Sequence, residues 1–444
     1  MNKRSEADRL KLFESVDLTT EKIRQLAFET GFCKRKSGKI DASYFLINLC
    51  IQSVQDTVSY NDLAAQVHSH SGVSASRQAY WERMNESCVR LFQRVLEHVI
   101  SPMRVHEELD HIKKERRYKR ILIQDSTIIR LPLRLFSAFS GVRNAYKAVC
   151  NARIQGIYDL VSGRFIQFSI DPYSKNDQAA TMDIPVQSGD LILRDRGYFT
   201  ITSIDNHKKA GCDSIHRYKH ETALFDPKTN KKINLLKLLS ENDSVDMLVH
   251  VDSKKKVTLR LVAEPVNEEI ANQRRSKAKK HMRGHAPSQE ILDLMSWTIF
   301  LTTITDASIS FKEILTLYGI RWRIENIIKT WKSNFHFNKI HNVSETQLRV
   351  LLSARIIMIT IIYQKIFLPM SLKIYKKTKR YLSLMKFMRY VSQNMASLQK
   401  LFDCCRGDND LLQAIIRYCS YEKRKRANFE TTTHNILKKI EVAY

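Results

Sequence analysis

Residues 318–332, with the sequence YGIRWRIENIIKTWK, combine one carboxylate with several cations and aromatic rings. At about 100° per residue, a helix over this segment places four polar residues within an arc of about 60°: Tyr318, Arg321, Glu325 and Lys332. Apolar residues from Leu317 to Trp331 fall in a second arc of about 80°, the face that a helix buries against a core. Glu325 is therefore expected beside the buried face, on a polar stripe that also carries cations.

Two aspartates lie at the ends of apolar runs that are typical of buried strands. Asp125 ends ILIQD, and Asp195 ends DLILRD before an Arg-Gly-Tyr turn. Strand ends are where α/β folds place ligands, although a single Asp there is more often a turn former or a helix cap. Three carboxylates gathered without a cation would repel one another, so Asp125, Asp195 and Glu325 together indicate a cation site. Carboxylates suit Mg²⁺, and two such ions can activate a water and stabilise the leaving oxygen of a phosphodiester.

The cations near Glu325 have a possible role in binding phosphate. Arg321, one turn before Glu325, could form an ordinary i,i+4 ion pair worth about 0.2–0.5 kcal/mol. Lys332 lies two turns beyond Glu325 and is not explained in that way. Arg and Lys on the stripe of a metal-binding acid suit phosphate binding, and Tyr318 adds a hydroxyl donor.

Composition points to a globular protein with a polyanionic partner. The 444 residues carry a formal charge of +27, from 73 Lys and Arg against 46 Asp and Glu, and nucleic acid is the leading candidate. A membrane is disfavoured, because no signal peptide or lipidation motif is found and the apolar stretch 351–363 is too short to span a bilayer. That stretch, which Arg355 interrupts, predicts a core helix. Eight scattered cysteines without a C-x-x-C pair predict free thiols.

The texture of the chain changes from helical to strand-rich near residue 118. Before it, Ser59 and Ser74 are expected to cap two helices around the turn HSHSG, and the second helix contains Arg77. This pattern fits a DNA-binding helix-turn-helix or an ordinary helical hairpin equally well. The predicted strands cover residues 121–125, 152–160, 164–171, 190–195, 212–218, 257–265 and 297–304, and Val161-Ser-Gly joins the second and third as a hairpin.

The motif Tyr-x2-Arg-x3-Glu-x6-Lys, here Tyr318, Arg321, Glu325 and Lys332, resembles the Y-R-E-K signature of DDE transposases in the insertion-sequence-four family of bacterial mobile elements. Asp125 in IQDSTIIRLP and Asp195 in GDLILRDRGYF resemble the first and second acids of that family. The resemblance covers residues from about 118 to 340, and the helical N-terminal segment more loosely.

The resemblance implies an α/β fold with an RNase H-like catalytic core that a β-rich insertion interrupts and that helical N- and C-terminal domains flank. The expected parts are a DNA-binding domain (1–115), the first part of the core (116–225), the insertion (226–295), the second part of the core with the catalytic helix (296–345) and a helical C-terminal domain (346–444). It also implies two Mg²⁺ ions, with Mn²⁺ as a substitute, at Asp125, Asp195 and Glu325.

The implied activity is cleavage of double-stranded DNA at the inverted repeats of a transposon and joining to target DNA, through a hairpin intermediate. A homodimer in the synaptic complex and a bacterial cytoplasmic, nucleoid-associated location follow by the same analogy. Trp297, before the catalytic helix, is expected either to stack on a base flipped out of the hairpin or to be a core residue. Two other hypotheses stay open: a catalytically silent DNA-binding regulator with the same fold, and a nuclease without strand transfer.

Overall fold

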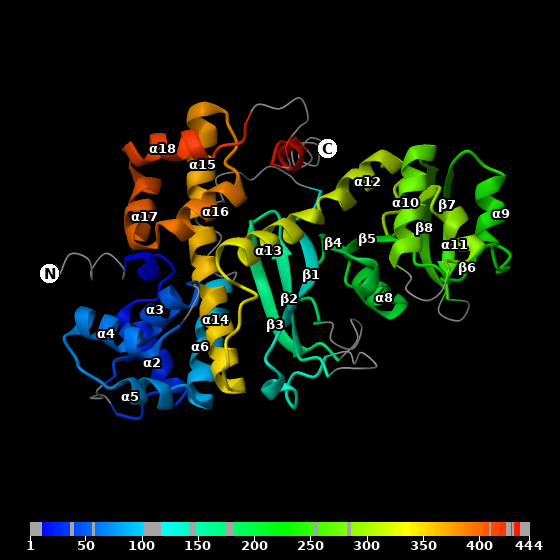
Figure 1. Ribbon diagram of the computed structural model, residues 1–444. Coiled ribbons are helices and arrows are strands. Elements are labelled where there is room, and N and C mark those ends of the chain that lie inside the picture. The colour runs from blue at the N-terminus through cyan, green and yellow to red at the C-terminus, as the bar shows by residue number, and fades with distance from the viewer. Residues whose placement is uncertain are drawn as a thin grey trace.

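The computed structural model describes residues 11–35, 40–55, 58–101, 117–141, 148–174, 182–252, 256–281, 286–407, 410–422, 428 and 430–435. A central sheet separates a helical body, formed by both ends of the chain, from a smaller body formed by residues inserted between two halves of the core (Figure 1). The prediction of an α/β core with helical flanks and a strand-containing insertion is confirmed, whereas the exact domain boundaries stay a prediction.

The core of the sheet has the strand order of an RNase H-like fold. Strands β1 (Arg120–Arg130), β2 (Asn151–Asp159) and β3 (Arg164–Pro172) form an antiparallel meander. On the other side of β1, β4 (Asp190–Arg194) and then β5 (Asp213–Arg217) pair in parallel, which gives the order β3-β2-β1-β4-β5. Helix α8 (Ile201–Lys209) connects β4 to β5, as a parallel pair requires a crossover. All five strands predicted in this part of the chain are present, although β1 is longer than predicted.

The insertion continues the same sheet instead of forming a separate one. The order runs on from β5 through β9 (Trp297–Thr302), β8 (Val257–Pro265), β7 (Val245–Val251) and β6 (Leu224–Phe225), all antiparallel neighbours. Helices α9 (Leu235–Ser240), α10 (Glu268–His281) and α11 (Gln289–Leu294) belong to this part. Its apolar residues, among them the fully buried Val249 and Leu259, form a second hydrophobic cluster that also includes Phe199 and Ile204 of the core.

The helical body draws on both ends of the chain and shares one hydrophobic core with the inner face of the sheet. Its first part comprises α2 (Thr20–Glu29), α3 (Ala42–Ser53), α4 (Tyr60–Ser71), α5 (Arg77–Glu82) and α6 (Glu86–Ile100). Its second part comprises α14 (Glu345–Ile362), a π-helical turn (Tyr363–Phe367), α15 (Leu368–Thr378), α16 (Leu384–Gln393), α17 (Leu398–Arg406) and α18 (Asp410–Cys419). Helix α14 lies against α3 and α6 and joins the two parts.

Helix α14 confirms the predicted core helix. Among the described residues, Glu345–Thr378 is the one helical stretch long and apolar enough to cross a membrane, and 94% of its most apolar window is buried inside the protein. All eight cysteines are free thiols, as predicted. The N-terminal helix pair differs in detail from the expectation. Helix α4 continues through the expected turn to Ser71, Gly72 ends it in the left-handed conformation, and Ser76 rather than Ser74 caps α5.

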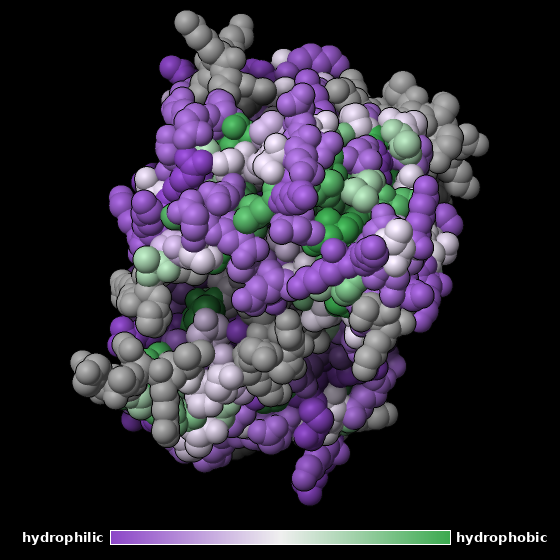
Figure 2. Space-filling view, turned by 90° about the vertical axis from the view of Figure 1, so that its right-hand side faces the viewer, coloured by the Kyte–Doolittle hydropathy of each residue, from purple (hydrophilic) through white to green (hydrophobic). Residues whose placement is uncertain are grey.

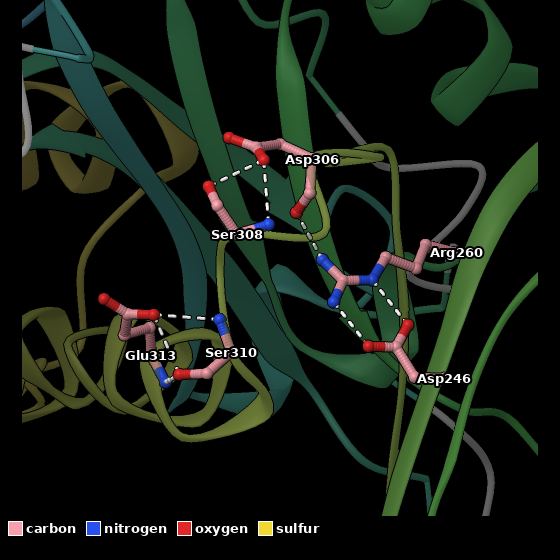
Figure 3. A network of polar contacts seen from close by, with 6 residues as sticks. All are labelled: Asp246, Arg260, Asp306, Ser308, Ser310 and Glu313. Carbon is pink, nitrogen blue, oxygen red and sulfur yellow. Dashed lines mark hydrogen bonds and ion pairs between the residues drawn. The ribbon is translucent and has the colours of Figure 1, made fainter.

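A polar network connects the insertion to the loop that leads to α12 (Figure 3). Arg260 of β8 is 2% exposed and donates to both carboxylate oxygens of Asp246 on β7, at 2.7 and 2.5 Å. Its remaining Nη1 donates to the backbone carbonyl of Asp306 at 2.6 Å. A few residues on, Ser310 and Glu313 form a reciprocal capping box that starts α12 (Phe311–Gly319). The buried guanidinium of Arg260 therefore joins the insertion to the loop before α12.

Candidate active site

Strand alternation brings Asp125 and Asp195 to the same face of the sheet. On β1, Ile121 and Ile123 face the large core, whereas Leu122 faces the smaller cluster on the opposite side. On β4, Leu191 and Leu193 likewise face the large core and Ile192 the opposite side. Because side chains alternate along a strand, both aspartates continue the face that looks toward the large core.

The strand register also places the two aspartates side by side. The parallel pairing of β1 with β4 ends at Gln124 opposite Arg194, so Asp125 and Asp195 are the next positions on adjacent strands. The prediction that Asp125 ends its strand is wrong: β1 continues to Arg130, because β2 pairs with it beyond the end of β4. Asp195 does follow the last residue of β4.

Glu325 comes to this edge from a helix that packs on β1. It lies in the first turn of α13 (Trp322–Asn334), and Arg321 Nη1 lies 2.7 Å from its Oε1. The single helix predicted over 318–332 is wrong, because α12 ends at Gly319 and α13 begins at Trp322. The N–H groups of Ile320, Arg321 and Arg323 donate to carbonyls three residues earlier, so a tight 3₁₀-like turn separates the helices.

The packing of α13 depends on a position directly across from Asp125. Gly156 of β2 pairs with Asp125, and a Cβ atom there would lie 2.9 Å from Cε1 of Phe165. The Phe165 ring in turn packs against Trp331 of α13 in a tilted arrangement, with ring centroids 5.0 Å apart and an interplanar angle of 44°. Because Gly156 has no side chain, Phe165 and Trp331 can pack here, and α13 lies close to β1, the strand that carries Asp125.

The three acids and Arg321 interact electrostatically. Burial raises the pKa of Asp125 to about 6, the Ser126 N–H and Arg321 oppose this shift, and the charges of Glu325 and Asp195 add to it. Burial lowers the pKa of Arg321, and four groups together raise it above its usual value: Tyr318, Glu325, Asp195 and Asp125. In the part of the chain that the structure describes, however, no three acid, His or Cys side chains are close enough to form a finished metal-ligand set.

The raised pKa of Asp125 gives a pH-dependent cost to the metal-free fold. The pKa of Asp125 is higher in the folded protein than in the unfolded chain, so burial of this residue costs least at low pH, where its carboxyl is protonated. The free energy of unfolding therefore falls as the pH rises through about 6. A shift of about two pKa units corresponds to about 3 kcal/mol. In EDTA, the stability of Asp125→Asn relative to the wild type should therefore rise by up to about 3 kcal/mol between pH 4 and pH 7.5. Denaturant titrations of both proteins at several pH values measure this difference, and a pH-independent difference would contradict it.

Tyr318 and Lys332 lie next to the acids but are engaged with the protein backbone. Tyr318 is buried, and its hydroxyl donates to the carbonyl of Arg194 at 3.3 Å, one residue before Asp195. The hydroxyl expected to bind DNA thus supports the end of β4 in this structure. Lys332 is half-buried and donates to the carbonyl of Ile128 at 3.4 Å. Burial lowers the pKa of Lys332, and the charge of Asp125 offsets part of this shift.

Trp297 lines a cavity of about 490 Å³, and Arg196, the residue after Asp195, lines it too. The sequence did not predict this cavity. The cations around it are Arg196, Arg217, Arg274 and Lys277, and the His220 side chain also lines the cavity. Burial lowers the pKa of Arg217 and of Arg274, and the charge of Arg196 lowers both further. Mutual repulsion of this kind favours a bound anion. In the sequence, Arg217 only ends a short polar strand and Arg274 only begins a cationic run, RRSKAKKHMR. The convergence of β5, β9 and α10 requires the fold.

Arg77 lies far from the acids, on the N-terminal helix pair. It is exposed at the start of α5 and lines a hollow of about 300 Å³ with Tyr60, Gln78 and Trp81. Trp81 is 51% exposed.

The end of the molecule that carries the insertion is mostly hydrophilic, with smaller hydrophobic patches between the polar side chains (Figure 2). The N-terminal helix pair and the insertion therefore both offer polar surface in addition to Asp125, Asp195 and Glu325.

Comparison with known proteins gives consistent matches over most of the chain. Residues 117–361 match the family model described as transposase DDE domain. The chain is 25% identical to the transposase for insertion sequence element IS231B of Bacillus thuringiensis subsp. berliner, over 92% of this chain and 90% of that protein. It is 24% identical to the transposase for insertion sequence element IS1151 of Clostridium perfringens, over 100% of this chain and 98% of that protein.

Among solved structures, the piggyBac transposase synaptic complex with hairpin DNA is similar at a TM-score of 0.40 and 15% identity, covering 97% of this chain and 89% of that chain.

Proposed function

As a member of the transposase DDE domain family, the protein is a transposase, and we propose that it cleaves and joins DNA at transposon ends with Asp125, Asp195 and Glu325. The observation that carries the proposal is the equal register of Asp125 and Asp195 on one face of the sheet, under the helix that bears Glu325. The raised pKa of Asp125 supports it, because a bound cation would offset the burial and repulsion that cause the shift.

The donor set fits hard divalent cations. Three carboxylates offer oxygen ligands of the kind that Mg²⁺ prefers and Mn²⁺ also accepts, and we propose two ions as cofactors. When bound, the ions supply a more acidic water and charge stabilisation at the attacking and leaving oxygens of the phosphodiester. Glu325 is ion-paired with Arg321 in this structure, so metal loading requires its carboxylate to share or exchange that partner.

The surrounding cations are proposed to bind the DNA strand being processed. Arg321 and Lys332 flank the acids, and Arg196, Arg217 and Arg274 form a second cationic group around Trp297. Phosphate would relieve the repulsion among these arginines, and the indole of Trp297 offers a stacking surface worth about 1–3 kcal/mol for an unpaired base. Tyr318 is assigned the role of holding the Arg194 carbonyl, and with it the position of Asp195.

Duplex DNA is the proposed partner of the wider basic surface. The net charge of +27 favours it, and exposed Arg77 at the start of α5 suits contact with a groove or backbone. A homodimer that holds two transposon ends, a hairpin intermediate and a cytoplasmic site of action complete the proposal by family analogy.

A cleavage and joining assay tests this function. The purified chain is mixed with a duplex that carries the element's terminal inverted repeat, a supercoiled target plasmid and Mg²⁺, Mn²⁺ or EDTA. The proposal predicts metal-dependent cleavage at the repeat boundary, a hairpin on one product and joined products in the plasmid. Binding without cleavage under any metal would support the regulator instead, and cleavage without joined products would support a nuclease.

A further inference from the structure

The C-terminal segment lies against the helix that carries Glu325. Residues 430–435 are helical, and Asn428 caps this turn by accepting from the N–H of Thr431 at 2.9 Å. His434 packs its ring against Tyr375 and Tyr381, with ring centroids 5.4 and 5.9 Å away. Residues more than 100 positions beyond Glu325 are thus held in a defined place beside α13.

Glu430 makes an ion pair with Arg323, and both side chains are largely buried. The exposed fractions are 8% for the Arg323 side chain and 16% for that of Glu430. Arg323 Nη2 also approaches the hydroxyl of Tyr363 at 3.4 Å, and that hydroxyl lies 2.9 Å from the hydroxyl of Tyr158 on β2. Tyr363 begins the π-helical turn after α14, a local irregularity often found at functional sites.

The same segment covers the tight turn between α12 and α13. Thr432 and Thr433 line a hollow of about 420 Å³ together with Gly319, Ile320 and Trp322. The C-terminal segment therefore contacts Arg323, the second residue of α13, and shares a hollow with the turn before that helix.

We propose that Glu430 is a positioning residue for the reaction: its ion pair with Arg323 holds the first turn of α13, and thereby Glu325, against the sheet. A cation in the first turn of a helix is disfavoured by the helix dipole, and a buried cation requires a counter-ion. Glu430 supplies that counter-ion. Arg323 and Glu325 lie two residues apart, so a shift of this turn moves Glu325 relative to Asp125 and Asp195.

The role in catalysis rests on the proposed function, whereas the contact can be tested without it. Glu430→Gln keeps the size of the side chain and removes its charge. Glu422→Gln is the matched control, because Glu422 pairs with Lys386 of α16 and its side chain is 64% exposed. Hydrogen exchange of the DNA-free proteins should show faster exchange at residues 326–330 of α13 in Glu430→Gln and no change there in Glu422→Gln.

The second measurement separates positioning from binding. At saturating end DNA, Glu430→Gln should lower the single-turnover cleavage rate at least tenfold while the Kd for that DNA stays within twofold of the wild type. Unchanged exchange in α13 would overturn the proposal whether or not the wild type cleaves DNA. So would a normal cleavage rate, or a variant that loses its fold as a whole, since the residue would then act on overall stability. If the wild type does not cleave DNA but exchange in α13 is still faster in Glu430→Gln, the contact between Glu430 and Arg323 stands. The catalytic role and the proposed function are then both overturned.

Discussion

Glu325→Gln is expected to lower the single-turnover rate of metal-dependent strand cleavage by about a thousandfold. The carboxylate is proposed to hold a metal ion whose charge stabilisation is worth several kcal/mol, and each factor of ten in rate corresponds to about 1.4 kcal/mol. An amide keeps the shape of the side chain and offers one neutral oxygen. The variant should bind end DNA at least as tightly as the wild type, because a negative charge near the phosphates is removed.

The matched control is Glu345→Gln, an acid-to-amide change in the first turn of α14. Glu345 makes an i,i+4 ion pair with Arg349 at 2.8 Å, and its side chain is 44% exposed. This variant should keep cleavage within about twofold, since an exposed pair contributes at most about 1 kcal/mol to stability. Cleavage by Glu325→Gln at a rate comparable with this control would show that Glu325 is not a ligand of the reacting metal.

Arg355→Met is expected to destabilise the protein by at least about 3 kcal/mol. Arg355 is 3% exposed within α14 and has four backbone carbonyls as acceptors. Its Nε donates to Ser53 at 2.5 Å, and its Nη1 donates to His336, Phe337 and Lys339 at 2.8, 3.4 and 3.2 Å. Loss of the guanidinium removes a donor from two buried carbonyls, those of Ser53 and Phe337, and each such loss costs about 1–3 kcal/mol. Because Ser53 ends α3 and His336 follows α13, the variant should also loosen the N-terminal helices from the catalytic helix.

Denaturant unfolding of Arg355→Met beside Arg349→Met measures this effect. Arg349 lies on the same helix, but its side chain is 30% exposed and pairs with an exposed acid, so its replacement should cost less than about 1 kcal/mol. Equal costs for the two variants would contradict the account of Arg355 as a buried link. Burial lowers the pKa of Arg355 to about 10, so it remains a cation at neutral pH.

Strands β1 and β4 could be predicted because each carries a continuous apolar run, Ile121–Ile123 and Leu191–Leu193, that ends at polar residues. The length of β1 could not, because its second half is held by β2 after β4 has ended, and pairing between distant segments is not visible in one strand's sequence. The same holds for β9, which joins the insertion to the core by pairing with both β5 and β8.

The candidate site was predicted through residue types and spacing, but not in its geometry. The helical period places Glu325 on the correct flank, yet it does not show the tight turn after Gly319 that separates Tyr318 from Glu325. The cations around Trp297 come from the turn after β4, from β5 and from α10, and Glu430 reaches Arg323 from the end of the chain. Tertiary packing alone brings such residues together, so spacing along the chain carries no signal of them.

The most direct test of the central claim is anomalous diffraction from crystals of the protein bound to cleaved end DNA and Mn²⁺. The account predicts Mn²⁺ peaks at about 2.1 Å from carboxylate oxygens of Asp125, Asp195 and Glu325, with Glu325 no longer held by Arg321 alone. Mn²⁺ bound at other residues, with Glu325 still paired only with Arg321, would contradict it.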